Sequence, residues 1–120
     1  MSSPRQAKKR FIAPRIDERT LQEAVKRIVA AAKPSRVILF GSHARNRADR
    51  NSDLDIMVVK PQVTDKGAEM VRLHEVVGDV GTGVDVLVYS DEEFEKRSRV
   101  PGTVLYWARK EGIALYEATR

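Results

Sequence analysis

Three aspartates draw attention because each lies in or beside an apolar segment typical of a buried strand. Asp53 and Asp55 belong to "DLDIMVV" (residues 53–59), and Asp85 belongs to "VDVLVY" (residues 84–89). Side chains alternate between the two faces of a strand, so Asp53 and Asp55 point the same way, with Cα atoms about 6.5 Å apart. Two neighbouring carboxylates repel each other unless a cation or a proton lies between them. The spacing therefore predicts a cation site.

An all-oxygen pair of carboxylates suits Mg²⁺ or Mn²⁺. If the two strands are neighbours, Asp85 joins Asp53 and Asp55 in one cluster. Three such acids can hold two divalent ions about 3.5–4 Å apart, as in polymerase-type phosphoryl transfer. Asp53 alone is better explained as the end of a turn, so the prediction rests on the combination.

A Gly-Ser pair ends the strand that precedes the acids. Ten residues separate Ser42 from Asp53. Gly41 allows the backbone to turn sharply and to approach a ligand closely. We expect Ser42 to open a short helix over "HARNRA" (residues 43–48). Helix N-termini bind anions, so this end is a candidate site for phosphate. Arg45 is expected either to add positive charge to the phosphates or to pair with a nearby acid.

Four other polar or aromatic residues receive structural interpretations. His43 is expected beside the site or exposed, and not as a metal ligand. His74 lies next to an apolar stripe and is expected to be structural. Tyr106 and Trp107, together with Leu105, are expected to form the core of the last helix.

Helical and strand patterns alternate along the chain, which predicts an α/β fold. The predicted helices cover residues 17–34, 65–81, 90–99 and 103–112, and the predicted strands cover residues 36–40, 53–59, 84–89 and 113–117. Two pairs, Thr20 with Glu23 and Ser90 with Glu93, have the spacing of a capping box at a helix N-terminus.

The charge distribution predicts a basic N-terminal tail, residues 1–15, followed by one domain, residues 16–120. The net charge is +5, from 22 basic and 17 acidic residues. Five of the basic residues and none of the acids lie in the tail, so the remainder is formally neutral. The tail is either a flexible leader or an arm that contacts RNA or an acidic partner.

Composition excludes several classes of site. The chain has no cysteine, so disulfides and thiolate metal sites are excluded. No apolar run approaches the roughly 18 residues that span a bilayer, and no signal peptide opens the chain. We expect a cytoplasmic protein that does not enter the membrane.

These residues resemble the nucleotidyltransferase superfamily related to DNA polymerase beta, whose pattern is Gly-Ser, about ten residues, Asp-x-Asp, and a third Asp on a later strand. More narrowly, "GSHARNRADRNSDLDIMVV" (residues 41–59) is similar to the minimal nucleotidyltransferases, as is "GTVLYWARKEGIALYE" (residues 102–117). The resemblance covers about residues 20–117. One departure is Asn46, where many relatives have Gly.

The resemblance implies a polymerase beta-like nucleotidyltransferase fold, a short mixed sheet packed against helices. It implies a Mg²⁺-dependent transfer of a nucleoside monophosphate, AMP from ATP, to a hydroxyl. Two Mg²⁺ ions are implied, with Mn²⁺ as the alternative. By position, Gly41 and Ser42 would hold the triphosphate, and Asp53 and Asp55 would bind both metals. Asp85 would complete the site as a ligand and a candidate base.

The resemblance also implies a partner. Minimal nucleotidyltransferases often act as antitoxins of HEPN-type RNase toxins, and some attach AMP to a tyrosine of the toxin. A protein adenylyltransferase acting as such an antitoxin is therefore the leading expectation. A non-catalytic antitoxin that masks its toxin and a small-molecule nucleotidyltransferase remain alternatives. The base of the nucleotide, the acceptor atom and the oligomeric state stay open.

Overall fold

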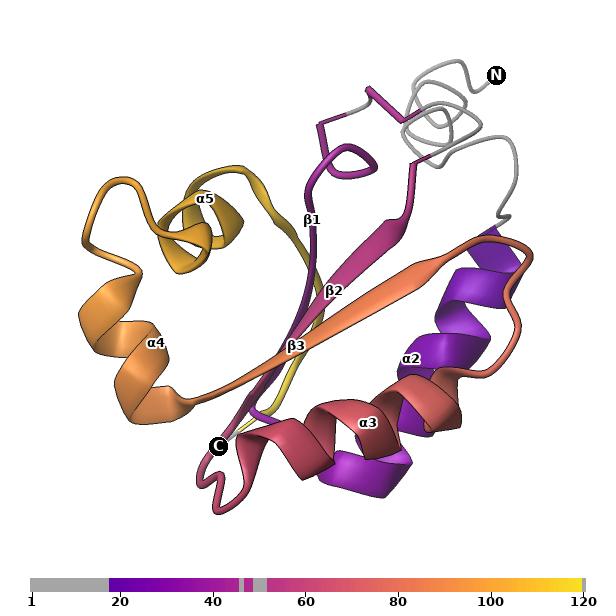
Figure 1. Cartoon of the computed structure of the whole chain (residues 1–120), viewed down its shortest axis with the longest axis horizontal. Coiled ribbons are helices and arrows are strands. Elements are labelled where there is room, and N and C mark those ends of the chain that lie inside the picture. Colours follow the sequence, from indigo (N-terminus) through magenta and orange to yellow (C-terminus); the bar gives the residue numbers. More distant parts are fainter. Residues whose placement is uncertain (1–17, 46, 49–51, 120) are drawn as a thin grey trace.

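A computed structural model describes residues 18–45, 47–48 and 52–119 of the chain. The predicted tail and Asn46 lie outside the described residues. The elements, in chain order, are α2 (Glu18–Ala32), β1 (Arg36–Phe40), β2 (Leu54–Lys60), α3 (Lys66–Val77), β3 (Val84–Ser90), α4 (Asp91–Arg97), α5 (Val104–Glu111) and β4 (Ile113–Glu117) (Figure 1). In this part of the chain, no helix is long and apolar enough to cross a membrane.

The four strands form one mixed sheet in the order β3-β2-β1-β4. β1 runs antiparallel to both β2 and β4, whereas β2 and β3 are parallel. α3 provides the crossover that two parallel neighbours require. The α/β class with a short mixed sheet, expected from the sequence, is confirmed.

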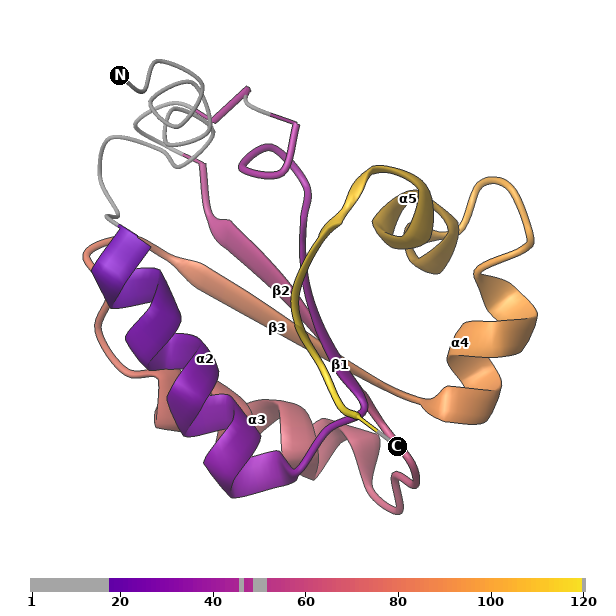
Figure 2. The same ribbon diagram turned by 180° about the vertical axis from the view of Figure 1, so that it is seen from behind.

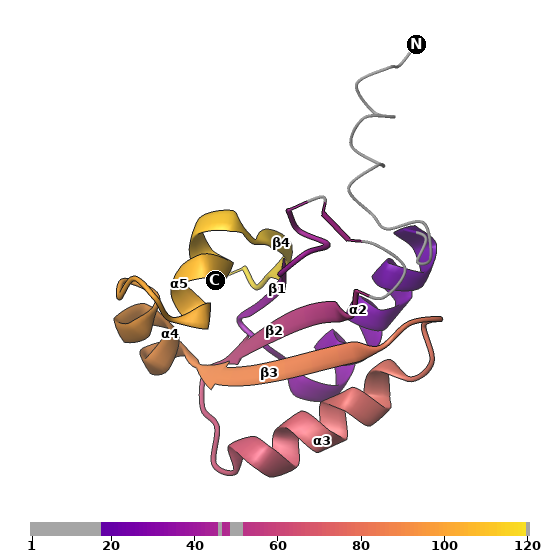
Figure 3. The ribbon, with the colours of Figure 1, turned by 45° about the horizontal axis from the view of Figure 1, so that its top comes forward.

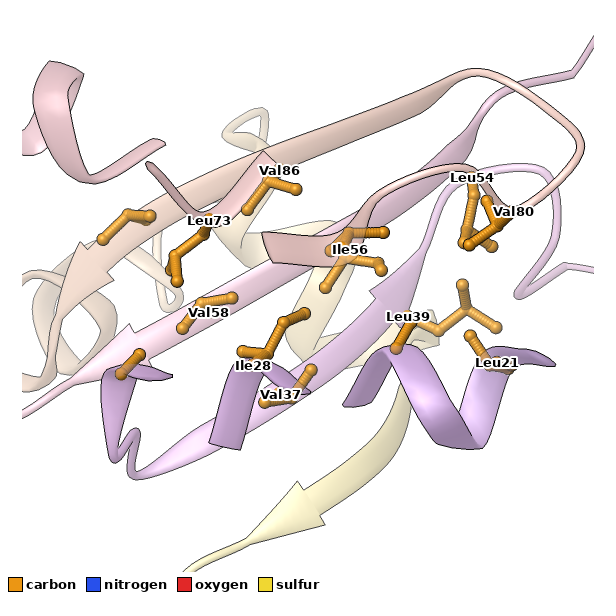
Figure 4. Packing of buried hydrophobic residues seen from close by; sticks show 14 residues of the cluster. Leu21, Ile28, Val37, Leu39, Leu54, Ile56, Val58, Leu73, Val80 and Val86 are labelled. Atoms are coloured by element: carbon orange, nitrogen blue, oxygen red, sulfur yellow. The ribbon is translucent and has the colours of Figure 1, made fainter. Parts of the chain in front are cut away.

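Helices cover both faces of this sheet. α2 and α3 lie side by side on one face, and α4 and α5 lie on the other (Figures 2 and 3). The strands supply a core to each layer, because successive side chains point to opposite faces. On β2, Ile56 and Val58 pack toward α2 and α3 (Figure 4), whereas Met57 and Val59 pack toward α4 and α5.

Most element boundaries follow the sequence prediction. β1 and β4 match their predicted ranges. α3 ends at Val77, four residues before its predicted end, because Gly78 with φ of +73° leaves the helical conformation. Ser90 and Glu93 form the predicted capping box of α4. The second predicted box is wrong: Thr20 lies inside α2, which already includes Glu18.

The core position expected for Trp107 is wrong, and the one expected for Tyr106 holds only in part. Leu105 is buried as expected, and it packs with Ala108 on the β1 side of α5. A residue two positions along a helix points to another side, and Trp107 is accordingly 44% exposed. Tyr106 is half-buried beside it. His74 is exposed on α3, and its structural role stays a prediction.

An ion-pair network joins the end of β2 to α3. The Glu69 carboxylate accepts from Lys60 Nζ at 2.6 Å and from Arg72 Nη2 at 2.7 Å. Its side chain is only 15% exposed. These two cations, Arg72 above all, lower the pKa of Glu69 from 4.5 to about 2. Arg72 also donates to the Ala31 carbonyl at 3.1 Å, which ties α3 to α2.

We expect Glu69→Gln to lower the free energy of unfolding at pH 7 by about 1.5–3 kcal/mol, the usual size for charged hydrogen bonds. Because the folded pKa is depressed, this stabilisation is present above the unfolded pKa near 4.5 and is lost as the pH falls toward 2. Urea unfolding at pH 7 and below pH 3 measures both values. Glu23→Gln, an exposed acid 4.0 Å from Lys26, is the control and should change little. An equal loss at both pH values would contradict the prediction.

Candidate functional site

Two of the predicted acids lie directly opposite each other. The parallel register pairs Asp55 of β2 with Asp85 of β3. Both project from the sheet face that α4 and α5 cover, because they alternate with Ile56 and Val86, which pack on the opposite face. The two carboxyl groups are close enough to interact, since Asp85 raises the pKa of Asp55. The neighbouring strands expected for Asp55 and Asp85 are therefore present.

The electrostatics of the pair favour an added positive charge. The pKa of Asp55 rises from 3.8 to about 6, first because the carboxyl is partly buried, then because Asp85 and Asp53 are negatively charged. The hydrogen bond with Asp85 acts in the same direction, and the charge of Arg45 acts against it. The mutual repulsion means that a cation or a proton beside Asp55 relieves a local cost.

Asp53 lies just before β2 and is exposed. Two hydrogen bonds tie its flanking residues to the segment before β3: Thr82 Oγ1 donates to the Ser52 carbonyl at 3.1 Å, and Leu54 N donates to the Gly83 carbonyl at 2.8 Å. The Asp53 carboxylate lies against Gly83, where a Cβ atom would collide with Oδ1. Gly83 thus makes room for Asp53.

Gly41 has the same relation to Asp55. It follows the last residue of β1, Phe40, which pairs with Asp55 across the sheet. Its φ of +76° lies in the left-handed region, and a Cβ atom there would collide with Asp55 Oδ2. Gly41 therefore satisfies two constraints at once, a backbone turn and a close approach.

The segment after Gly41 is a turn and not the predicted helix. Within residues 41–45 and 47–48 the structure shows a single helical turn, in which the Gly41 carbonyl accepts from Ala44 N and Arg45 N, both at 3.1 Å. Ser42 is half-buried at its start. The prediction of a helix N-terminus at Ser42 is wrong, although Ser42 does lie one residue from the glycine that contacts Asp55.

The pairing with a nearby acid that we expected for Arg45 is present, and its phosphate role stays a prediction. Its Nη1 lies 3.6 Å from Oε1 of Glu111 on α5, and the two side chains are 42% and 38% exposed. Such an exposed pair contributes at most about 1 kcal/mol. The Arg45 charge also lowers the pKa of Asp55, so it acts at the acid cluster as well.

Sequence reasoning missed two features of the site. His43 is buried, with 2% exposure, so the exposed position that we allowed for it is wrong. Gly83 was not singled out as a site residue. Its signal was the "GTG" segment, residues 81–83, directly before the strand that carries Asp85.

The donors fit a divalent cation that also binds a ligand. Among the described residues, no group of three His, Cys, Asp or Glu side chains converges enough to hold a metal ion by itself. Mg²⁺ normally keeps several waters and takes one or two carboxylates plus substrate phosphate oxygens. Asp55 and Asp85 supply such a pair of carboxylates, and after burial the charges of Asp85 and Asp53 are the next causes of the raised pKa of Asp55.

The chain matches the family model "Nucleotidyltransferase domain" over residues 18–114. Among solved structures, it is similar to a protein from Sulfolobus solfataricus provisionally described as a nucleotidyltransferase, with 26% identity, a TM-score of 0.54, and coverage of 82% of this chain and 86% of that one. Two toxin-antitoxin structures share the fold.

One is a toxin-antitoxin with AMP-PNP, at 22% identity and a TM-score of 0.59. The other is a mutant of the toxin-antitoxin MntA-HpeT, at 20% identity and a TM-score of 0.58. Each match covers 82% of this chain and 74% of the other. The search of curated proteins finds no match.

We expect Asp85→Asn to lower the pKa of Asp55 from about 6 toward its ordinary value of 3.8. The substitution removes the charge of Asp85, and its amide can donate a hydrogen bond to the ionised Asp55. A ¹³C NMR titration of the carboxyl groups without divalent metal measures the change. Glu92→Gln, a 79% exposed acid on α4, is the control. An unchanged pKa of Asp55 would show that the two groups do not interact.

We expect Gly83→Ala to weaken Mn²⁺ binding about tenfold, the size seen when residues that orient metal ligands are changed. The new Cβ displaces the Asp53 carboxylate, while that exposed side chain can move without unfolding the protein. Proton relaxation enhancement by Mn²⁺ measures the affinity. Gly67→Ala is the matched control, because its Cβ would have only Asp65 Oδ1 nearby, at 3.9 Å. Equal affinities in both variants would refute the positioning role of Gly83.

Proposed function

The chain belongs to the nucleotidyltransferase domain family, and on this premise we propose that it transfers AMP from ATP, with Mg²⁺, to a hydroxyl of a partner protein. The observation that carries the proposal is the in-register pair of Asp55 and Asp85, with Gly41 packed against the Asp55 carboxylate. This arrangement joins a carboxylate cluster to the turn after β1 at one end of the sheet.

The turn after β1 would receive the triphosphate. Gly41 brings the backbone close to Asp55, and Ser42 supplies a hydroxyl beside it. Arg45, whose charge already acts on Asp55, would help to neutralise the phosphates. Asp53, Asp55 and Asp85 would hold the divalent ions, which, when bound, stabilise the negative charge on the reacting phosphate and on the leaving group.

Asp85 would act on the acceptor, because β3 is the edge strand and carries this acid on the open side of the pair. In the reaction the hydroxyl oxygen forms a bond to the α-phosphorus of ATP. The bond between that phosphorus and the bridging oxygen to the β-phosphate breaks, and pyrophosphate leaves. The hydroxyl proton passes to Asp85 as the general base.

The toxin partner is inferred only from the similarity of this chain to other proteins. Two structures with the same fold are described as toxin-antitoxin assemblies, one with AMP-PNP. Together with the resemblance to minimal nucleotidyltransferases, this supports an antitoxin role against a HEPN-type RNase toxin. The predicted RNA contact involves the tail, which lies outside the described residues, so RNA stays an untested prediction.

The proposal predicts that Asp53→Ala lowers transfer at least about a hundredfold, the size of loss when one group of an electrostatic site is removed. The measurement is incorporation of α-labelled ATP, with Mg²⁺, into fractionated lysate of the source organism. Glu92→Ala, a 79% exposed acid on α4, should retain wild-type labelling. Labelling by Asp53→Ala at the wild-type level would refute the assigned site.

A neutralisation assay separates transfer from masking. The double variant Asp53→Ala, Asp55→Ala should lose antitoxin activity if AMP transfer neutralises the toxin. If this variant still neutralises, binding alone suffices and the masking alternative replaces the proposal. Label in a small-molecule fraction, with none in protein, would favour the third alternative.

A further inference from the structure

A groove of about 600 Å³ runs from the acid pair to the exposed side of α3. Asp55, Asp85 and Leu87 line one end, and Met70, Val71 and Glu75 of α3 line the other. β3 lies between the two ends, at the outer edge of the sheet, with α3 beside it (Figure 3). The site for transfer is therefore continuous with a surface that the transfer chemistry itself does not require.

Because β3 is an edge strand, this surface can pair with an extended peptide. β3 pairs with β2 on one side only, so its outer backbone groups face away from the sheet. Such an edge can bind an extended peptide through main-chain hydrogen bonds. The seven residues of β3 are long enough to pair with a segment of about five residues.

The α3 wall of the groove carries two apolar side chains, Met70 and Val71, beside His74 and Glu75. Val71 is 61% exposed, the most exposed of the large hydrophobic residues in the described part of the chain. It lines the groove together with Met70. Val84 and Leu87 of β3 continue the apolar lining of the groove, and apolar side chains that gather beside an open strand edge offer a contact surface to a partner.

The charges of the groove select among partners. Of the ten residues that line it, three are acids, Asp55, Glu75 and Asp85, and none is Lys or Arg. Asp55 and Asp85 hold divalent ions in the proposed function, so the charge argument rests on the rest of the lining, which has one acid, Glu75, and no Lys or Arg for the phosphates of RNA. A basic polypeptide segment has the complementary charge, and a neutral one is not repelled.

We propose that this groove receives an extended, neutral or basic segment of the acceptor protein, which pairs with the edge of β3 and carries its hydroxyl to Asp85. The inference rests on the proposed function and names how its acceptor is bound. Val71 and Glu75 are then docking residues, outside the groups that bind nucleotide or metal.

Two variants test the docking surface. Val71→Arg replaces the apolar contact with a bulky charge, and Glu75→Lys reverses the charge next to it. We expect each to lower labelling of the acceptor protein from α-labelled ATP by at least about tenfold. Binding of ATP with Mg²⁺ to the same full-length variants, measured by calorimetry, should stay at the wild-type level.

The chain offers matched controls for both changes. Val100→Arg alters another exposed valine, 50% exposed in the loop between α4 and α5, and Glu92→Lys reverses an exposed acid on α4. Both should label as the wild type does. If Val71→Arg and Glu75→Lys also label normally, the groove is not the docking surface, while the proposed function stands.

Two further outcomes would overturn the inference in other ways. Label in RNA and not in protein would show a nucleic-acid acceptor. Loss of labelling only in Val100→Arg would place the acceptor on the side of α4 and α5. A wild-type protein that binds no ATP and labels nothing would refute the proposed function itself, which distinguishes that failure from failure of the groove.

Discussion

The partial burial of Asp55 beside a second carboxylate, Asp85, on the neighbouring parallel strand is the constraint around which the site is built. Asp55 and Asp85 face each other because β2 and β3 pair in register, and the cost of this placement appears as the raised pKa of Asp55. A fold selected only for stability would place an apolar pair at this position, as it does with Ile56 and Val86 on the other face. The acids are retained at a cost, which is expected of a site that binds cations.

The two faces of the sheet have different roles, and apolar burial on one of them offsets this cost. The face toward α2 and α3 buries side chains from three strands, among them Val37, Ile56 and Val88, all fully buried. Each such side chain contributes about 1.5–3 kcal/mol. The opposite face is apolar farther along β2, at Met57 and Val59, and carries the acid at Asp55. One strand thus anchors the core and presents the site, with no change in its backbone geometry.

Two glycines adapt the surrounding backbone to the acids. Gly41 and Gly83 come from different loops, yet each lies against one carboxylate of the Asp53–Asp55 pair. The Thr82 and Gly83 hydrogen bonds to residues 52 and 54 hold one of these loops in place. The site is therefore an assembly of the β1 turn and the β3 entry around the start of β2. Its open side lies at the edge strand, which is where an acceptor has room.

The sequence by itself determined the α/β class, the strands and the acid triplet, because the period-two alternation around Asp55 and Asp85 is a local property of each strand. A local pattern does not determine which strands pair, in which register they pair, or which side chains they bury. Tertiary packing alone decided that β3 pairs with β2 and that Gly83 lies under Asp53. It also left Trp107 exposed, because α5 packs through Leu105 and Ala108. The physical reason is that a side-chain pattern fixes which face is apolar, whereas contacts between distant segments fix what that face meets.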